Sequence, residues 1–256
     1  PTRLKVIAER LNLSQSTVSR ALNDYQDISD RTKQLVRATA DELGYQPNMH
    51  ARRLARGKSE TLGYVMPWQD RQMTESFLSE LMAGMAKALA GYGWDLTVLV
   101  PHSVEEELEL FQKIARTRHI SGLVISRTYS DDQRFRILRD LKIPFVSHGR
   151  SNDSDITAWL DVDNERAFAE MTAHLVELGH EHIAHIAGPE VYNFARQRAA
   201  GWRRGLGEAG LDPDGAPLEV TELSFDSGKA AMRRLLARNP RPTAICCVSD
   251  VVAIGA

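Results

Sequence analysis

Residues 4–23, LKVIAERLNLSQSTVSRALN, read as a helix, a tight turn and a second short helix. Ser14 is the expected N-cap of the second helix, because its hydroxyl can accept from a free backbone N–H. The outer face of this helix carries Gln15, Ser16 and Arg20. An amide, a hydroxyl and a guanidinium are groups that hydrogen-bond base edges in the major groove of DNA. The stretch therefore predicts a helix-turn-helix that binds DNA.

The flanking sequence extends this unit and then breaks it. Ser29 is the expected N-cap of a third helix that Gly44 ends, so residues 1–45 are predicted to form a three-helix headpiece. Residues 46–60 begin with Gln46-Pro47, where the proline restricts the backbone of the residue before it, and they continue as a basic run, MHARRLARGK, at 49–58. A helix this short is marginal in water. The run is either a flexible linker or a hinge helix that forms only on a partner.

From residue 61 the hydrophobic pattern changes to alternating strands and helices. The expected strands cover 62–66, 94–100, 122–125, 144–146, 183–187, 218–223 and 243–248, and the expected helices cover 75–91, 104–116, 133–141, 164–178, 196–209 and 227–238. This alternation is typical of parallel sheets with right-handed crossovers. The short, continuously apolar strands indicate sheets that are covered on both faces. We therefore predict an α/β body over residues 61–256.

Composition and charge narrow the function class. The chain is 43% hydrophobic and 26% charged, with no run of 18 apolar residues and no apolar signal-peptide core. We expect a cytoplasmic protein that does not contact a membrane. Its adjacent Cys246 and Cys247 read as reduced core residues. Residues 1–60 carry a net charge of +4 and the remainder −6, which fits a nucleic-acid-binding head on an acidic body.

Motifs along the whole chain match one known family. They are SQSTVSRALN at 14–23, IS at 28–29, TK at 32–33, LGYQPN at 43–48, ARRL at 51–54, LG at 62–63, GL at 122–123, IP at 143–144, DN at 163–164, LGH at 178–180, IAGP at 186–189, RAAGW at 198–202, PTAI at 242–245 and SDVVAIGA at 249–256. With these motifs the chain resembles the lactose/galactose repressor (LacI/GalR) family of bacterial transcription regulators.

The resemblance implies an architecture and partners. Behind the headpiece and the hinge it implies a periplasmic-binding-protein-like body with two Rossmann-type lobes, at about 61–160 and 161–256. A ligand cleft between the lobes, a homodimer and a palindromic double-stranded DNA operator are also implied. Family members continue past the position of Ala256, so the resemblance implies a C-terminally truncated chain with an incomplete second lobe.

The DNA contacts divide into base readers and phosphate contacts. Gln15 suits adenine, Arg20 suits guanine and Ser16 suits either base. The other DNA-contact candidates, from the headpiece and the hinge, are Thr17, Ser19, Asn23, Arg31, Thr32, Asn48, Ala51, Arg52 and Leu54. Among them the resemblance assigns Leu54 as a wedge into the minor groove, where an apolar side chain unstacks a base step and bends the duplex. The alternative is that Leu54 packs on its own body domain.

The resemblance also implies effector-binding residues. Arg198 precedes Ala-Ala-Gly-Trp as the family's ligand-binding arginine does, and a guanidinium can bind two adjacent sugar hydroxyls. Phe77 and Phe225 fall near the family's stacking positions, although both could equally be core residues. Trp68, Trp159, Tyr192, Asn193 and Phe194 are further candidates for the cleft walls.

Three effector candidates follow from strand ends. Ser126 and His148 lie at the carboxyl ends of predicted first-lobe strands, where α/β proteins bind ligands. His148 could instead be an ordinary loop residue. Asp250 follows a buried strand, where an acid accepts ligand hydroxyls or caps the next helix.

The leading hypothesis is a repressor whose operator affinity changes when a small carbohydrate binds. A purine or a protein co-effector is the alternative within this class. A sugar-binding transport protein is a second class, which the DNA head argues against. An enzyme is not expected, because the chain lacks a nucleotide loop, a nucleophile elbow and metal-spaced ligands. We expect no catalytic residues, cofactor or metal, and we interpret His180, His182 and His185 as structural.

Overall fold

The structure is a computed structural model that describes residues 4–45, 59–67, 76–152 and 158–256. The chain divides into two compact units at residues 1–58 and 59–256, and each is described by itself. The hinge candidates Asn48, Ala51, Arg52 and Leu54 lie outside the described residues, as does Trp68. Among the described helices, none has the length and apolar character needed to span a membrane.

The described part of the first unit contains three helices around a small core. They are α1 (Leu4–Leu11), α2 (Gln15–Leu22) and α3 (Asp30–Glu42). One side of each helix is apolar, so Ile7, Val18 and Val36 pack together with no exposed surface. This packing leaves the opposite side of α2 at the surface.

The sequence signals at the helix ends are confirmed in this unit. The Ser14 hydroxyl accepts a hydrogen bond from the Thr17 amide at 3.0 Å, and Ser29 accepts from the Thr32 amide at 3.3 Å. Gly44 takes a φ of +59°, the left-handed conformation that favours glycine after a helix. These local interactions mark the start of α2 and both ends of α3.

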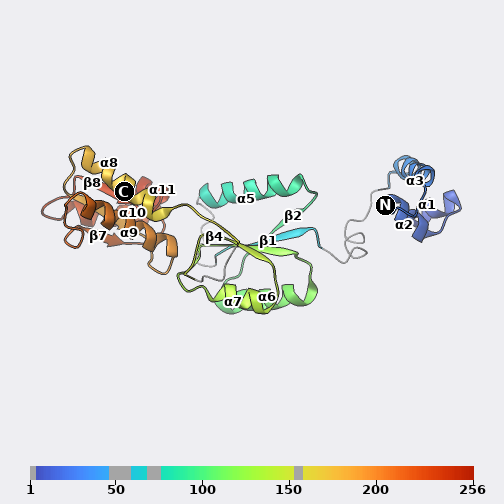
Figure 1. The fold of residues 1–256 in the computed structure, drawn as a ribbon, viewed down its shortest axis with the longest axis horizontal. Coiled ribbons are helices and arrows are strands. Elements are labelled where there is room, and N and C mark those ends of the chain that lie inside the picture. The colour runs from blue at the N-terminus through green and yellow to red at the C-terminus, as the bar shows by residue number, and fades with distance from the viewer. Residues whose placement is uncertain (1–3, 46–58, 68–75, 153–157) are drawn as a thin grey trace. The chain divides into compact units, whose positions relative to one another are not determined.

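The first lobe of the second unit is a parallel sheet covered on both faces (Figure 1). Its elements are β1 (Thr61–Val65), α5 (Ser76–Ala90), β2 (Asp95–Leu99), α6 (Val104–Thr117), β3 (Gly122–Ser126), α7 (Gln133–Asp140), β4 (Phe145–His148) and β5 (Trp159–Leu160). The strand order is β2-β1-β3-β4-β5, with every pair parallel. In Figure 1, α5 lies on one face of this sheet, and α6 and α7 lie on the other.

Alternation along the central strands explains the two layers. Tyr64 and Val124 point to the face that packs with Leu78 of α5. Their neighbours Val65 and Leu123 point to the other face, where they join the cores of α6 and α7. Successive strand residues point to opposite faces, so continuously apolar strands fill both layers.

The second lobe repeats this arrangement with a smaller sheet. Its elements are α8 (Asn164–Glu177), β6 (Ile183–Ala187), α9 (Asn193–Glu208), β7 (Leu218–Val220), α10 (Phe225–Leu236), β8 (Ala244–Cys247) and α11 (Asp250–Gly255). The strands run parallel in the order β7-β6-β8. The inner strand residues Ile183 and Cys246 pack with Trp202 of α9. Their sequence neighbours Ala184 and Cys247 pack in the other core, which includes residues of α10 and α11.

The structure contains the strands and helices that the sequence predicts, although several of them begin or end at other residues. It also contains two short elements that were not expected. Helix α9 begins at Asn193 rather than at residue 196, because its N-cap Tyr192 makes no side-chain cap bond that the sequence could signal. Helix α10 begins at Phe225 rather than at residue 227, since the capping hydroxyl is that of Ser224. The ranges expected from the sequence pattern did not include β5 and α11, which are two and six residues long.

His185 lies in the core of the second lobe, which agrees with its interpretation as structural. Its side chain has no exposed surface and lies between the rings of Phe168 and Trp202. Its Nδ1–H donates to the Cys246 carbonyl at 2.8 Å, and its Nε2 has no partner among the described residues. Burial lowers the pKa of His185 to about 4.

This lowered pKa predicts acid sensitivity. Between about pH 6.5 and pH 4 the unfolded chain binds a proton at His185 that the folded chain does not. The free energy of unfolding should therefore fall on acidification, by about 1.4 kcal/mol per pH unit from this group. Urea unfolding from pH 7 to pH 4 measures the slope. We expect His185→Gln to flatten it, whereas the exposed control His174→Gln should not; equal slopes in both variants would contradict the prediction.

Candidate functional site

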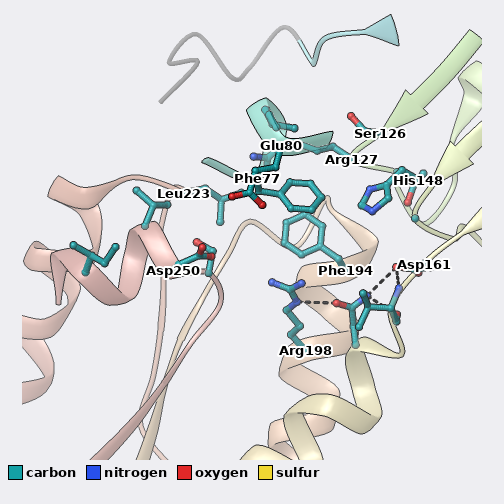
Figure 2. A pocket seen from close by; sticks show the side chains of 18 residues that line it. Phe77, Glu80, Ser126, Arg127, His148, Asp161, Phe194, Arg198, Leu223 and Asp250 are labelled. Carbon is teal, nitrogen blue, oxygen red and sulfur yellow. Dashed lines mark hydrogen bonds between the residues drawn. The ribbon is translucent and has the colours of Figure 1, made fainter. Parts of the chain in front are cut away.

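A cavity of about 500 Å³ lies where the two lobes of the second unit meet. This volume is typical of a small-molecule site. The first lobe lines it with Phe77, Leu78, Glu80, Ser126, Arg127, Thr128, His148 and Gly149, the segment between β5 and α8 with Asp161 and Val162, and the second lobe with Asn164, Phe194, Arg198, Leu223, Ser249, Asp250, Val251 and Ile254. Figure 2 shows the labelled side chains converging on one space from both lobes.

Strand topology explains why these residues meet. In a parallel sheet all the carboxyl ends share one edge, and ligands bind outside that edge. Ser126 ends β3, His148 ends β4, and Ser249 and Asp250 follow β8. Of the six predicted effector residues, five line the cavity. The lining does not include Phe225, whose side chain is about half exposed at the first turn of α10.

Arg198 is held in place within the second lobe, by the first residue of α8 and by the residue that follows β8. Its Nε donates to the Asn164 Oδ1 at 2.8 Å, and its Nη1 donates to the Val248 carbonyl. Asn164 in turn donates from Nδ2 to the Asp161 Oδ1 at 3.2 Å, as the dashed lines in Figure 2 show. No hydrogen bond forms at Nη2 of Arg198 among the described residues. That group is therefore available to a ligand.

Close packing of two helices brings Arg198 and Asn164 together. A Cβ atom on Gly201 would lie 2.0 Å from the carbonyl oxygen of Glu165, so only glycine allows α8 and α9 this approach. Burial lowers the pKa of Arg198, and the nearby carboxylates of Asp161 and Asp250 act in the opposite direction. A guanidinium keeps its charge under such conditions, so Arg198 adds a fixed positive charge to a cavity wall that also contains Arg127, Asp161 and Asp250.

Aromatic side chains form another part of the cavity wall. The rings of Phe77 and His148 lie 5.3 Å apart, and Phe194 lies 5.0 Å from the guanidinium carbon of Arg198. Burial lowers the pKa of His148, so its ring is neutral near pH 7 and can donate or accept a hydrogen bond. Phe77 is 47% exposed and is therefore not an ordinary core residue. Aromatic faces beside hydrogen-bonding groups suit a sugar or another small polar ring.

Two serines behave differently in the cavity. The Ser126 hydroxyl is bonded to the hydroxyl of Tyr64 at 2.7 Å. The Ser249 hydroxyl is buried without a hydrogen-bond partner among the described residues. Sequence reasoning missed Ser249, although its place between a buried strand and Asp250 was a usable signal. The N-cap position of α11 is Ser249, so Asp250 does not act as that cap.

The further candidates for the cleft walls occupy different places. Asn193 joins the lobes, because its amide donates to the Thr128 carbonyl at 2.9 Å and its Nδ2 donates to the Arg150 carbonyl at 2.8 Å. Tyr192 is buried, and it forms an antiparallel bridge with Tyr129 of the first lobe. These contacts lie directly beside Thr128 in the cavity wall. Trp159 does not line the cavity and is 48% exposed.

The predicted base readers share one exposed face of α2. Gln15, Ser16 and Arg20 are exposed, opposite the buried Val18 and Ala21. The remaining headpiece candidates are partly buried, apart from Arg31, which is exposed. Three of them make hydrogen bonds within the headpiece: Thr17 bonds to Ser14, Asn23 donates to the Ser19 carbonyl, and Thr32 bonds to Ser29. Gln15, Ser16 and Arg20 are thus more exposed than the other DNA-contact candidates of α2, Thr17 and Ser19. In the part of the chain that the structure describes, no cluster of three or more His, Cys, Asp or Glu could hold a metal.

Comparisons with known proteins agree with this architecture. Residues 3–48 match the model "Bacterial regulatory proteins, lacI family", and residues 59–256 match "Periplasmic binding proteins and sugar binding domain of LacI family". The HTH-type transcriptional regulator AglR of Rhizobium meliloti (strain 1021) is 38% identical, across 100% of this chain and 72% of its own length.

Two solved structures resemble the whole chain. The Lac repressor dimer bound to operator and the anti-inducer ONPF has a TM-score of 0.85 at 27% identity, and the transcriptional regulator CelR–cellobiose complex has 0.71 at 28%. Each match covers 100% of this chain and 76% of the other. These matches account both for the headpiece with its exposed polar helix and for the two-lobed body around a cavity. The chain belongs to the LacI family and is a DNA-binding transcriptional regulator, not an enzyme.

Proposed function

We propose that this regulator binds a palindromic operator as a homodimer, and that its operator affinity changes when a small carbohydrate occupies the cavity. The observation that carries the proposal is the cavity itself. It presents the guanidinium of Arg198 and the rings of Phe77 and Phe194 to one space, together with the hydroxyl of Ser249, which has no hydrogen-bond partner among the described residues. Such a set can bind sugar hydroxyls and stack on a pyranose face. CelR, a structural neighbour, was solved with cellobiose.

Effector control follows from the position of the inter-lobe contacts. Asn193 bonds to the Thr128 and Arg150 carbonyls immediately beside the cavity wall. A ligand that contacts both lobes favours the lobe arrangement in which it makes more contacts. If only one arrangement spaces two headpieces correctly for an operator, ligand affinity and DNA affinity are coupled. The domains in this proposal are the headpiece 1–45, the hinge 46–60 and the body 61–256, divided near residue 160.

The surface of α5 supports the homodimer. Of its side chains described from Phe77 to Ala90, only that of Leu78 is buried, although the stretch contains just two charged residues, Glu80 and Lys87. An apolar helix face of this kind is typical of a surface that a second copy covers. A dimer places two headpieces on two half-sites, which accounts for a palindromic operator. Regulation of transcription would take place in the cytoplasm.

For DNA binding, we expect Arg20→Ala to lower affinity for the cognate operator about ten- to a hundredfold. A bidentate arginine–guanine pair is worth about 1–3 kcal/mol. The operator is first selected from a random duplex library, and fluorescence anisotropy then measures specific and non-specific binding. The matched control is Arg10→Ala, which removes an exposed arginine from α1. A ratio of specific to non-specific affinity that Arg20→Ala leaves unchanged would refute the assignment.

The effector is tested on the full chain by thermal shift. Stabilisation by a ligand grows as RT ln(1+[L]/Kd), so even a millimolar ligand is detectable at high concentration. The panel includes cellobiose, common mono- and disaccharides, sugar phosphates and purines. A shift with a sugar that also changes operator affinity supports the proposal, whereas a shift with purines alone supports the alternative effector class. Sedimentation of the operator complex should give two chains per duplex.

A further inference from the structure

Arg20, the proposed guanine reader, is already engaged by its own headpiece. Its Nη2 forms an ion pair with a carboxylate oxygen of Asp27. Its guanidinium carbon lies 5.4 Å from the ring centroid of Tyr25, within the range of a cation–π contact. Both partners come from the loop that joins α2 to α3. The side chains of Arg20 and Asp27 are each 47% exposed, so the pair lies at the surface that DNA would approach.

The loop is held beside Arg20 by other bonds. The Tyr25 amide donates to the Arg20 carbonyl at 3.1 Å, and the Ile28 amide donates to the Tyr25 carbonyl at 3.3 Å. Asp24 forms a second ion pair with Arg37 of α3, with Nη2 and Oδ1 2.5 Å apart. The start of the loop is therefore attached both to α2 and to α3, and Asp27 pairs with Arg20 as part of the folded headpiece.

We propose that Asp27, assisted by Tyr25, is a specificity-determining residue that restricts Arg20 to base reading. This inference rests on the proposed base-reading role of Arg20. Asp27 neutralises the arginine, so a phosphate anywhere on the duplex gains little from it. At a cognate guanine the ordered guanidinium presents a fixed hydrogen-bonding edge, and less side-chain freedom is lost on binding. Non-specific DNA offers phosphates but no matching base edge.

The charge argument predicts a change in salt dependence. Each phosphate contact contributes a slope of about −0.9 to the dependence of log K on log salt. The Asp27→Asn variant lacks the carboxylate that pairs with Arg20, so Arg20 can contact a phosphate. The salt-dependence slope on non-specific DNA should therefore steepen by about that amount. The ratio of specific to non-specific affinity should fall about threefold to fivefold, the range expected for an exposed ion pair. Tyr25→Leu should lower the ratio in the same direction by a smaller factor.

The matched control is Asp24→Asn, which makes the same charge change in the same loop but breaks the ion pair with Arg37 instead. We expect it to strengthen binding to both kinds of DNA equally and to leave the ratio unchanged. A double-mutant cycle with Arg20→Ala isolates the pair. In the Arg20→Ala background, Asp27→Asn should no longer change the ratio.

The outcomes separate this inference from the proposed function. Wild-type protein without any sequence-specific DNA binding would refute the proposed function. Specific wild-type binding combined with an unchanged or increased ratio in Asp27→Asn would overturn only the role of Asp27. An equal drop in the ratio with and without Arg20 would also overturn it, since Asp27 would then act through general charge.

Discussion

Replacement of Arg198 by methionine should raise the effector concentration needed to change operator binding at least about tenfold. The guanidinium is held by Asn164 and the Val248 carbonyl, and Nη2 remains for the ligand. Hydrogen bonds to a charged group contribute about 1.5–3 kcal/mol each. Loss of the guanidinium should therefore weaken ligand binding by about tenfold to a hundredfold. The measurement titrates the sugar that gives the largest thermal shift against the protein–operator complex.

The controls distinguish ligand binding from folding. Arg196→Met removes an exposed arginine from the same helix and should leave the half-maximal sugar concentration unchanged. Arg198→Lys retains the charge but not the planar fork, and we expect it to recover little of the affinity. Arg198→Met should still bind operator, because it lies in the second unit and not in the headpiece. A half-maximal concentration within twofold of wild type would show that Arg198 does not bind the effector.

The second large effect concerns a buried ionic cluster behind the cavity wall. The guanidinium of Arg134 makes two bonds to Asp132, at 2.8 Å from Nε and 2.6 Å from Nη2, and its Nη1 lies 3.6 Å from Glu107. Nη2 also donates to the carbonyls of Ser126 and Arg127, which line the cavity. All three charged side chains are at most 8% exposed. Arg134 thus holds the turn after β3.

Removing the arginine would leave two buried acids without their cation. We expect Arg134→Met to destabilise the protein by about 3–5 kcal/mol and to lower its Tm by on the order of 10 °C. Differential scanning calorimetry of the full chain measures this loss. Burial already raises the pKa of Glu107, so Glu107→Gln should cost much less. The exposed control Arg136→Met should change the Tm by less than about 2 °C; a similar small change in Arg134→Met would contradict the prediction.

Local sequence signals determined the elements of this protein. Ser14 and Ser29 cap α2 and α3 as predicted, because a cap bond joins residues only three positions apart. The alternation of strands and helices predicted two parallel sheets, because burial on both faces requires continuously apolar strands. The exposed face with Gln15 and Arg20 also follows from helical periodicity. Ends without a side-chain cap, such as that at Asn193, were misplaced because they leave no local signal.

Tertiary structure decided which distant residues meet. The strand order β2-β1-β3-β4-β5 and the two-residue β5 depend on pairings that no local period encodes. Packing places Ser249 in the cavity and Phe225 outside its lining. Arg198 meets Asn164, 34 positions away, because Gly201 allows two helices to approach closely. The sequence by itself thus specifies the elements and the family, while the ligand cavity arises from long-range contacts that exist only once both lobes have packed.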